Sequence, residues 1–394
     1  MSLVYDVVET AASPAVIKVI GVGGGGCNAI NNMIKGAIHG VEFISANTDA
    51  QSLQRNEATR RVQLGTNLTR GLGAGANCEV GRNAALEDRE MLAEALRGAN
   101  MIFIAAGMGG GTGTGAAPVV AEIAKEMGIL TVAVVTRPFA YEGSKRQKVA
   151  QEGIDALKKQ VDSLIVIPND KLLHALGDDV TMREAFKAAD EVLHSAISGI
   201  SEVITSPGII NLDFADVKNV MGIMGMAMMG SAHATGLDRA KEATNQAISS
   251  PLLDDITLDG ARGVLVNVTT APGCLKMSEY NEIMSVINQY VHPDAERKIG
   301  TAEDETMDED AIRVTIIATG LNGPMQNGAH AKEIVHEHLN LIATGTDGAT
   351  SYDINNVARG GRGAKAAPNT SPDFSSQSLV DSYDVPAFLR RQAD

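Results

Sequence analysis

Glycines gather at three places in this sequence where the backbone could approach a phosphate group. The clusters are Gly21–Asn28, Gly71–Asn77 and Gly107–Gly115, and each precedes a stretch with helical spacing. Glycine lets successive backbone amides turn toward one anion, and the N-terminus of a following helix adds the positive end of its dipole. Six of the nine positions in the last cluster are glycine, more than a tight turn requires. The sequence therefore predicts a polyphosphate site.

The groups that would hold this polyphosphate are mostly uncharged. None of the clusters contains the Gly-Lys-Ser/Thr of a P-loop, and those at Gly21 and Gly107 carry no lysine or arginine. Backbone amides, threonine hydroxyls and Mg²⁺ must then bind the anion, with the metal bridging the phosphates through oxygen ligands. No side chain is assigned as a metal ligand. The candidate contacts are Gly24, Gly25, Gly26, Cys27, Asn28, Ala74, Gly75, Ala76, Gly109, Gly110, Gly111, Thr112, Gly113 and Thr114.

The first cluster alone also fits a dinucleotide site. Gly21, Gly23 and Gly26 match the GxGxxG pattern, and Asp49 follows the next apolar run at about the distance of a ribose-binding acid. A dinucleotide fold has no routine need for the glycines that begin at Gly107. An NAD-dependent oxidoreductase is therefore the alternative from another class.

A pair of residues farther along the chain could recognise a base. Phe186 and Asp190 are four residues apart in a helical pattern and so share one face. A carboxylate there can accept hydrogen bonds from both N1–H and the exocyclic amine of guanine, a donor pair that adenine lacks. On spacing alone, a core phenylalanine beside a solvated aspartate is the commoner arrangement.

A parallel sheet is expected to position these residues. Short runs rich in valine and isoleucine alternate with helical spacing, which is typical of βαβ units. The apolar runs cover residues 15–22, 41–46, 101–106, 129–135 and 163–168, and the helical spacing covers 26–34, 79–96 and 117–127.

A long helix follows this alternation. Thr181 and Glu184 form a capping box at its start, and Ser206 marks its end. About 23 helical residues at about 1.5 Å each span roughly 34 Å, about the width of a domain. Its apolar stripe is Met182, Phe186, Ala189, Leu193, Ala196, Ile200 and Val203. We expect this helix to join two domains and to pack against both.

The remaining sequence completes the predicted organisation. The fold class is α/β, with a Rossmann-like parallel-sheet domain joined by the long helix to a smaller α+β domain, then a disordered linker and a tail peptide. The methionine-rich run Met221–Met229 is interpreted as core packing of a helix. The predicted divisions are an extension at 1–13, a nucleotide-binding domain at 14–180, the helix at 181–205, a second domain at 206–320, the linker at 321–380 and the tail at 381–394.

Composition excludes several classes of function. The chain has 33 basic and 48 acidic residues, a formal charge of −15, which argues against direct binding to nucleic acid or anionic lipid. No apolar run reaches the roughly 18 residues of a membrane span, so a cytosolic protein is expected. The three cysteines are far apart, and no GxSxG or HExxH motif occurs, so disulfide, zinc and serine-hydrolase chemistry lack support.

Six motifs taken together resemble the tubulin/FtsZ GTPase superfamily, in particular its bacterial cell-division members. They are GGGGCNA at 23–29, NTDA at 47–50, GLGAGAN at 71–77, GGGTGTG at 109–115, NLDFADV at 211–217 and DVPAFLRRQAD at 384–394. The resemblance implies a cytoplasmic GTPase that polymerises into filaments of the mid-cell division ring. It implies GTP or GDP as ligand, Mg²⁺ bound mainly through the nucleotide phosphates, and admits K⁺.

The resemblance also assigns further residues and partners. Glu142 and Arg146 would lie near the ribose and phosphates, Phe186 and Asp190 would contact the base, and Asn169 would also bind the nucleotide. Asn211, Asp213 and Asp216 would act in hydrolysis, completing the active site of the next subunit in a head-to-tail polymer. Partners would be further copies of the chain, regulators such as MinC, and FtsA, with ZipA as a second candidate, through Asp381–Asp394. Membrane contact would then be indirect.

Two simpler interpretations stay open at this point. Asp213 and Asp216 could merely cap a turn, and the protein could form filaments without hydrolysing nucleotide.

The tail pattern of Val385, Phe388 and Leu389 favours a helix that folds into a partner's groove over a frayed terminus.

Overall fold

The computed structural model describes residues 15–321, except residues 178, 207, 251, 254–259 and 293. The predicted extension at 1–13 and tail at 381–394 lie outside this range, as does the linker beyond Leu321. None of the described helices is long and apolar enough to cross a membrane.

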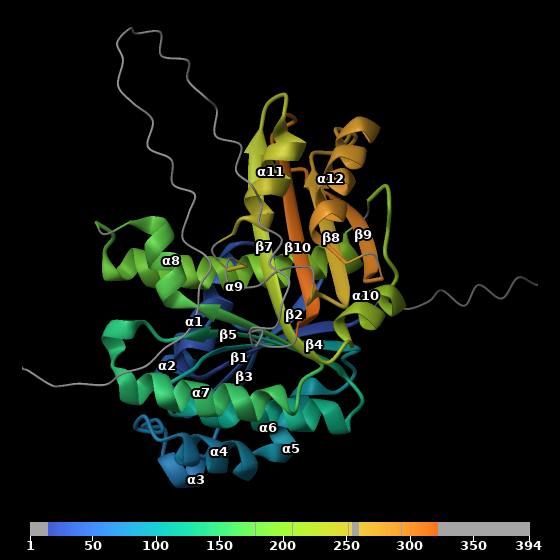
Figure 1. Ribbon diagram of the computed structural model, residues 1–394. Coiled ribbons are helices and arrows are strands. Elements are labelled where there is room, and N and C mark those ends of the chain that lie inside the picture. Colours follow the sequence, from blue (N-terminus) through green and yellow to red (C-terminus); the bar gives the residue numbers. More distant parts are fainter. Residues whose placement is uncertain are drawn as a thin grey trace, which may run out of the picture. The chain divides into compact units, whose positions relative to one another are not determined.

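The described strands form one ten-stranded sheet (Figure 1), in the order β3-β2-β1-β4-β5-β6-β7-β10-β8-β9. Strands β3 to β7 run parallel, and β10 is antiparallel to both β7 and β8. The strands are β1 (Ile17–Val22), β2 (Val41–Asn47), β3 (Arg60–Gln63), β4 (Met101–Gly107), β5 (Leu130–Arg137), β6 (Ser163–Pro168), β7 (Gly225–Thr235), β8 (Gly263–Thr270), β9 (Glu296–Glu303) and β10 (Ala311–Leu321).

Helices cover both faces of this sheet. Side chains of α1 and α9 pack in one apolar cluster with β1, β4, β5 and β6, whereas α4 to α7 pack on the opposite face. The helices are α1 (Gly23–Lys35), α2 (Ala50–Gln54), α3 (Thr66–Thr69), α4 (Cys78–Glu87), α5 (Arg89–Leu96), α6 (Thr112–Glu126), α7 (Ser144–Lys158), α8 (Asn169–Leu176), α9 (Met182–Thr205), α10 (Phe214–Met221), α11 (Arg239–Ile248) and α12 (Met277–Tyr290), with a 3₁₀ turn at Ala140–Glu142.

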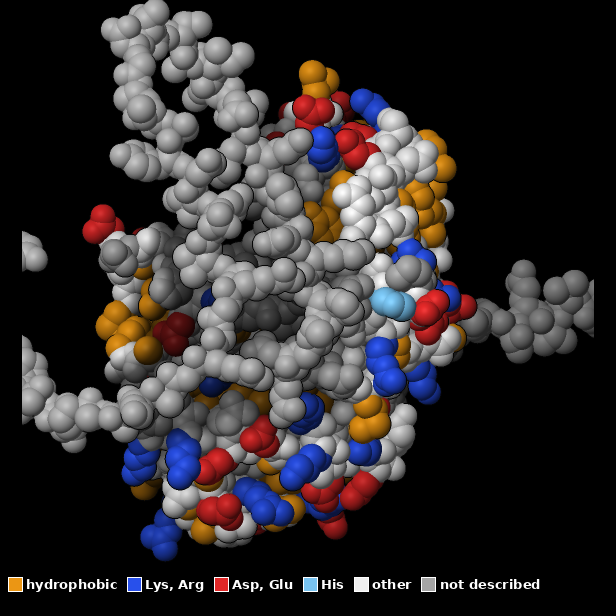
Figure 2. All heavy atoms as spheres, in the orientation of Figure 1, with side chains coloured by type: hydrophobic (Ala, Val, Ile, Leu, Met, Phe, Trp, Pro, Cys, Tyr) orange, Lys and Arg blue, Asp and Glu red, His pale blue; other side chains and the backbone are white. Residues whose placement is uncertain are grey.

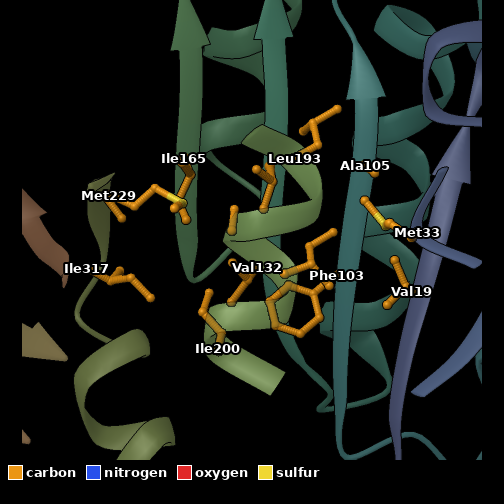
Figure 3. Close-up of a cluster of buried hydrophobic side chains, with 14 of the residues drawn as sticks. Val19, Met33, Phe103, Ala105, Val132, Ile165, Leu193, Ile200, Met229 and Ile317 are labelled. Carbon is orange, nitrogen blue, oxygen red and sulfur yellow. The ribbon is translucent and has the colours of Figure 1, made fainter. Parts of the chain in front are cut away.

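The predicted long helix is confirmed as α9, including its capping box. Thr181 Oγ1 accepts the backbone N–H of Glu184, whose carboxylate accepts the N–H of Thr181 in return. Leu193 and Ile200 of α9 point into a core with Val132 and Ile165 (Figure 3), and Met229 and Ile317 of the later strands join it. The apolar stripe leaves the core at its N-terminal end, because Met182 and Phe186 are exposed.

Two expectations about secondary structure are wrong. The single helix expected at 79–96 is two helices, and they meet at Asp88, whose carboxylate accepts the backbone N–H of Gly65. The methionine-rich run is not a helix in the core. It leaves α10 at Met221 and enters strand β7, where Ala227 and Met229 are buried and alternate with half-buried neighbours at the period of a strand.

The sheet continues from the first predicted domain into the second without a break, because β6 pairs with β7. The expected α/β fold with a Rossmann-like parallel sheet is confirmed. The division at 14–180, 181–205 and 206–320 stays a prediction.

Candidate functional site

A cavity of about 390 Å³ opens where the carboxyl ends of β1, β4, β5 and β6 meet the N-terminal half of α9. The order β2-β1-β4 places β1 and β4 at the point where the strand order reverses, which is where open α/β sheets bind ligands. The lining residues are Gly24, Gly25, Asn28, Gly107, Met108, Gly110, Gly111, Thr112, Gly113, Thr136, Pro138, Glu142, Arg146, Asn169, Phe186, Ala189, Asp190 and Leu193.

Two helices begin at this cavity without a side-chain cap. Helix α1 starts at Gly23 after Val22, and α6 starts at Thr112 after Gly111; neither preceding residue has a side chain that accepts a first-turn N–H. The first four amides of a helix have no partner within the helix. Together with the two helix dipoles, these amides make an anion site at the cavity floor.

The glycines of the two loops have different tasks. A Cβ at Gly24 or Gly110 would meet no atom within 4 Å, so these residues leave backbone open to a ligand in the cavity. A Cβ at Gly113 would instead lie 2.6 Å from the carbonyl oxygen of Gly107, closer than real Cβ contacts come. Gly113 thus lines the cavity and also packs against backbone, so part of the glycine content serves backbone-to-backbone packing.

In the first and second glycine loops, four residues predicted to contact phosphate are not among the lining residues of the cavity: Gly26, Cys27, Gly109 and Thr114. Gly26 packs against backbone of β4, and Cys27 is buried, which raises the pKa of its thiol to about 11. The Thr114 hydroxyl accepts the N–H of Gly109 at 2.9 Å and so fixes the turn of the second loop. These positions support the loops from behind.

The third glycine loop flanks the second. A Cβ at Gly111 would lie 2.8 Å from the Cβ of Ala74 and 2.9 Å from the backbone nitrogen of Asn77. Ala74, Gly75 and Ala76 are not among the lining residues. Their contact with a phosphate stays a prediction, and in this structure the loop holds Gly111 in place.

Aromatic rings and an ion pair close one side of the cavity. Phe139 stacks on Tyr141 with ring centroids 5.1 Å apart and meets Phe186 edge-on at 5.3 Å. The Glu142 carboxylate pairs with the Arg146 guanidinium at 2.9 Å and accepts the N–H of Phe139. An apolar wall beside a held guanidinium suits a base and ribose on one side and phosphate on the other.

Asp190 faces this cavity from α9 with one oxygen already engaged. Its Oδ2 accepts a hydrogen bond of 2.7 Å from Nδ2 of Asn32, on α1. Burial raises the pKa of Asp190 to about 6, although the bond from Asn32 opposes the shift. The group is therefore mostly ionised at pH 7 and can accept hydrogen bonds from a guanine edge.

Asn169, at the start of α8, also lines this cavity. Its side chain is buried, and its Oδ1 has no hydrogen-bond partner among the described residues. A buried acceptor without a donor is costly, so this amide is an exception to the usual pairing of buried polar groups.

The three residues assigned to hydrolysis do not line this cavity. Asp213 caps α10, because its Oδ1 accepts the N–H of Asp216 at 2.7 Å. Asn211 accepts the N–H of Gly208 at 2.9 Å, and the Asp216 carboxylate pairs with Lys298 at 2.7 Å. The structure therefore brings the three together beyond the C-terminal end of α9, whereas the cavity lies at its N-terminal end.

Six lining residues had not been predicted. Thr136 lies near the carboxyl end of β5 and Pro138 follows the strand, at the same sheet edge as the glycine loops, so the carboxyl-end rule could have found them. Ala189 and Leu193 share the α9 face of Phe186 and Asp190, so helical spacing was their signal. Gly107 and Met108 begin the second loop itself.

The sequence matches family models over both halves of the described region. Residues 16–177 match the Tubulin/FtsZ family, GTPase domain, and residues 225–322 match the FtsZ family, C-terminal domain. The chain belongs to the tubulin/FtsZ GTPase family. Membership in this family brings GTP or GDP binding with it and removes the dehydrogenase alternative. Asp49, the acid of that alternative, instead caps α2.

Individual relatives agree with this assignment. The cell division protein FtsZ of Neisseria meningitidis serogroup A is 65% identical over 100% of this chain and 99% of its own length. That of Pseudomonas putida is 52% identical over 99% of this chain and all of its own. The solved structure of an empty FtsZ dimer from M. jannaschii has a TM-score of 0.74 at 44% identity, covering 78% of this chain and 88% of that one.

The Asp190 geometry predicts guanine selectivity. Asp190→Ala removes the acceptor for two guanine donors and should weaken GDP binding by about 1–3 kcal/mol, about 5- to 150-fold. Adenine nucleotides should bind wild type weakly and be little affected by the change. Competition of ATP and of GDP against labelled GDP measures both, and equal competition by ATP in wild type would contradict the assignment.

The pKa of Asp190 provides an internal control for this experiment. Because the carboxylate form binds guanine and the pKa is raised to about 6, affinity is full above that pH and is lost as the pH falls through it. Between pH 7 and pH 5 the ionised fraction falls about tenfold, and wild-type affinity should follow. Asp190→Ala should lack this step and show only the titration of the phosphates.

Proposed function

We propose that this protein binds and hydrolyses GTP, assembles head to tail into filaments, and acts in the cytoplasm in a cytokinetic ring at the division site of a bacterial cell. Family membership supports the nucleotide and the GTPase activity. The name carried by relatives at 52–65% identity, cell division protein FtsZ, supports the cellular role.

One observation carries the proposal that the active site is shared between subunits. The carboxylates that line the cavity are Glu142 and Asp190, and each is already engaged, with Arg146 and with Asn32. The carboxylates assigned to hydrolysis stand beyond the other end of α9, whose 24 residues at about 1.5 Å each extend about 36 Å. A neighbouring subunit would have to supply them to the nucleotide.

Exposed apolar side chains at both ends of α9 support such stacking. Tyr141 and Met182 are exposed beside the cavity, and Ile209 is 65% exposed beside the carboxylates. Joining these two ends head to tail would remove apolar surface from water. The M. jannaschii relative was solved as a dimer, which also supports self-association of this chain.

The proposed mechanism divides the work between two subunits. Backbone amides of the first and second glycine loops hold the phosphates and Asp190 orients the base. Asp213 and Asp216 of the next subunit, with Asn211, orient and polarise the attacking water. Mg²⁺, with K⁺ as a further cation, would offset phosphate charge. The described residues contain no group of three or more His, Cys, Asp or Glu side chains placed to hold a metal ion.

A shared site makes turnover depend on assembly. GTP turnover per molecule should be near zero in dilute solution and rise to a plateau over the concentrations at which right-angle light scattering appears. GDP, ATP and NAD should not induce scattering. Turnover per molecule that is constant at every concentration would show that each subunit hydrolyses GTP alone.

The role of the carboxylates can be separated from helix capping. Asparagine caps helices as well as aspartate does, so Asp213→Asn should keep α10 intact yet lose the charge. We expect Asp213→Asn and Asp216→Asn to bind GTP almost normally and to hydrolyse it at least about 100-fold more slowly. Asp213→Ala should behave likewise but lose about 1 kcal/mol of stability with its cap.

Mixing provides the second measurement for these variants. Added to wild type, each should lower wild-type turnover, because mixed filaments contain sites that lack a carboxylate. Asp213→Asn with normal turnover would make Asp213 a cap only, and a loss of GTP affinity in proportion to activity would place it in binding.

The tail proposal concerns residues outside the described range. We propose that Asp381–Asp394 folds as a helix into a groove of FtsA, with ZipA as a second candidate, while regulators such as MinC also bind the protein. A chain ending at Val380 should assemble normally with GTP but fail to bind FtsA in a pull-down. In the full chain, Phe388→Ala should abolish binding and Gln392→Ala should not; unchanged binding of the truncated chain would refute the proposal.

A further inference from the structure

The loop that carries the hydrolytic residues lies along the edge strand β9. Backbone N–H of Thr301 donates to the carbonyl oxygen of Ile210 at 2.9 Å, and the N–H of Ile210 donates to Oγ1 of Thr301 at 2.8 Å. A Cβ at Gly300 would lie 3.4 Å from the Leu212 side chain, so the strand leaves room for this residue to pack. Strand β9 therefore fixes the loop up to Leu212.

Beyond Leu212, one side chain of β9 holds the chain in place through Asp216. Lys298, two residues before Gly300, reaches Asp216 with its ammonium group 2.7 Å from Oδ1. Both side chains are 30% exposed, so the pair is neither buried nor free in solvent. Figure 2 shows charged side chains of both signs gathered at the right-hand edge of the molecule, where Figure 1 places α10 and β9.

Three carboxylates act on the ammonium group of Lys298. The hydrogen bond with Asp216 raises the pKa of the lysine, and the negative charges of Glu296 and Asp213 act in the same direction. Its Nζ is 4.0 Å from Glu296 and 2.7 Å from Asp216, so Asp216 is the nearer partner. The ammonium thus pairs with the Asp216 carboxylate and is also attracted by the charge of Asp213, so it offsets the repulsion between the two carboxylates.

We propose that Lys298 is a positioning residue for hydrolysis, holding the Asp216 carboxylate at the start of α10 before the nucleotide of the next subunit arrives. It rests on the function proposed above, in which Asp213 and Asp216 orient the attacking water. Lys298 acts through Asp216 and touches no nucleotide. Without the ammonium, the Asp216 side chain turns freely in solvent and its repulsion from Asp213 is no longer offset.

Three substitutions separate charge from packing. Lys298→Met keeps most of the side-chain length and loses the charge, and Lys298→Arg keeps a cation within reach of Asp216. Lys35→Met is the matched control, because Lys35 pairs with Glu57 at 3.6 Å on α1, away from the hydrolytic loop. GTP turnover in the full chain is measured as kcat and KM, with assembly followed by light scattering in a slowly hydrolysed GTP analogue.

We expect Lys298→Met to lower kcat about tenfold with KM and analogue-driven assembly within about twofold, since a displaced group slows chemistry without changing binding. Lys298→Arg should recover most of kcat, and Lys35→Met should match wild type. In an Asp216→Asn background, Lys298→Met should change the residual kcat by less than about twofold, because its effect passes through that carboxylate.

The outcomes distinguish the positioning role of Lys298 from the proposed hydrolytic site shared between subunits. Normal kcat in Lys298→Met beside a slow Asp216→Asn would overturn the positioning role alone. An equal loss in Lys298→Met with and without the Asp216 carboxylate would also overturn it. Normal turnover in Asp213→Asn and Asp216→Asn would instead overturn the shared hydrolytic site, and the Lys298 proposal with it.

Discussion

Close packing of backbone against backbone at the carboxyl end of the parallel strands is the constraint on which the site depends. Two helices must begin within reach of one anion, and this brings the loops before α1 and α6 into direct contact. Gly23 takes a positive φ, and a Cβ there would lie 2.7 Å from the nitrogen of Gly113. Side chains at such positions would force the helix starts apart, and their unpaired amides would no longer converge.

Helix α9 determines the distance between the cavity and the segment that carries Asp213 and Asp216. Its N-terminal turns carry Phe186 and Asp190 to the cavity, its middle packs Leu193 and Ile200 into the core, and its end leads to the segment with Asp213 and Asp216. A rigid helix fixed at its middle cannot bring its two ends together. The same burial that stabilises the fold therefore separates base recognition from the residues proposed for hydrolysis.

Local signals in the sequence predicted the parallel sheet, the α9 capping box and the glycine-rich floor of the cavity, because periodicity, caps and glycine clusters are local. Three further lining residues came only from the family resemblance, namely Glu142, Arg146 and Asn169. The sequence did not separate glycines that line the cavity with open space beside them, such as Gly110, from those that only face other backbone, such as Gly26. That difference depends on which loops meet in space. The pairing of Asn32 with Asp190, across 158 positions, has no local signal either.

Charged side chains were the hardest to interpret for the same reason. Lys298 lies in the strand sequence Glu-Arg-Lys-Ile, and nothing in these residues predicts that its partner is Asp216, 82 positions earlier. The methionine-rich run was mistaken for a helix because methionine suits either element, and its pairing with β6 and β10 decides that it is a strand.

Because Asp213 and Asp216 lie beyond the far end of α9, the nucleotide state of a filament built this way would depend on when each subunit joined. Each nucleotide would be hydrolysed only after a neighbour docks, so subunits that joined earlier would hold diphosphate and recent arrivals triphosphate. The terminal subunit whose cavity faces solvent would keep its triphosphate until the next one lands. The ratio of bound diphosphate to triphosphate along the polymer would then follow the order of growth. A partner that binds one nucleotide state better would distinguish recently added segments from earlier ones.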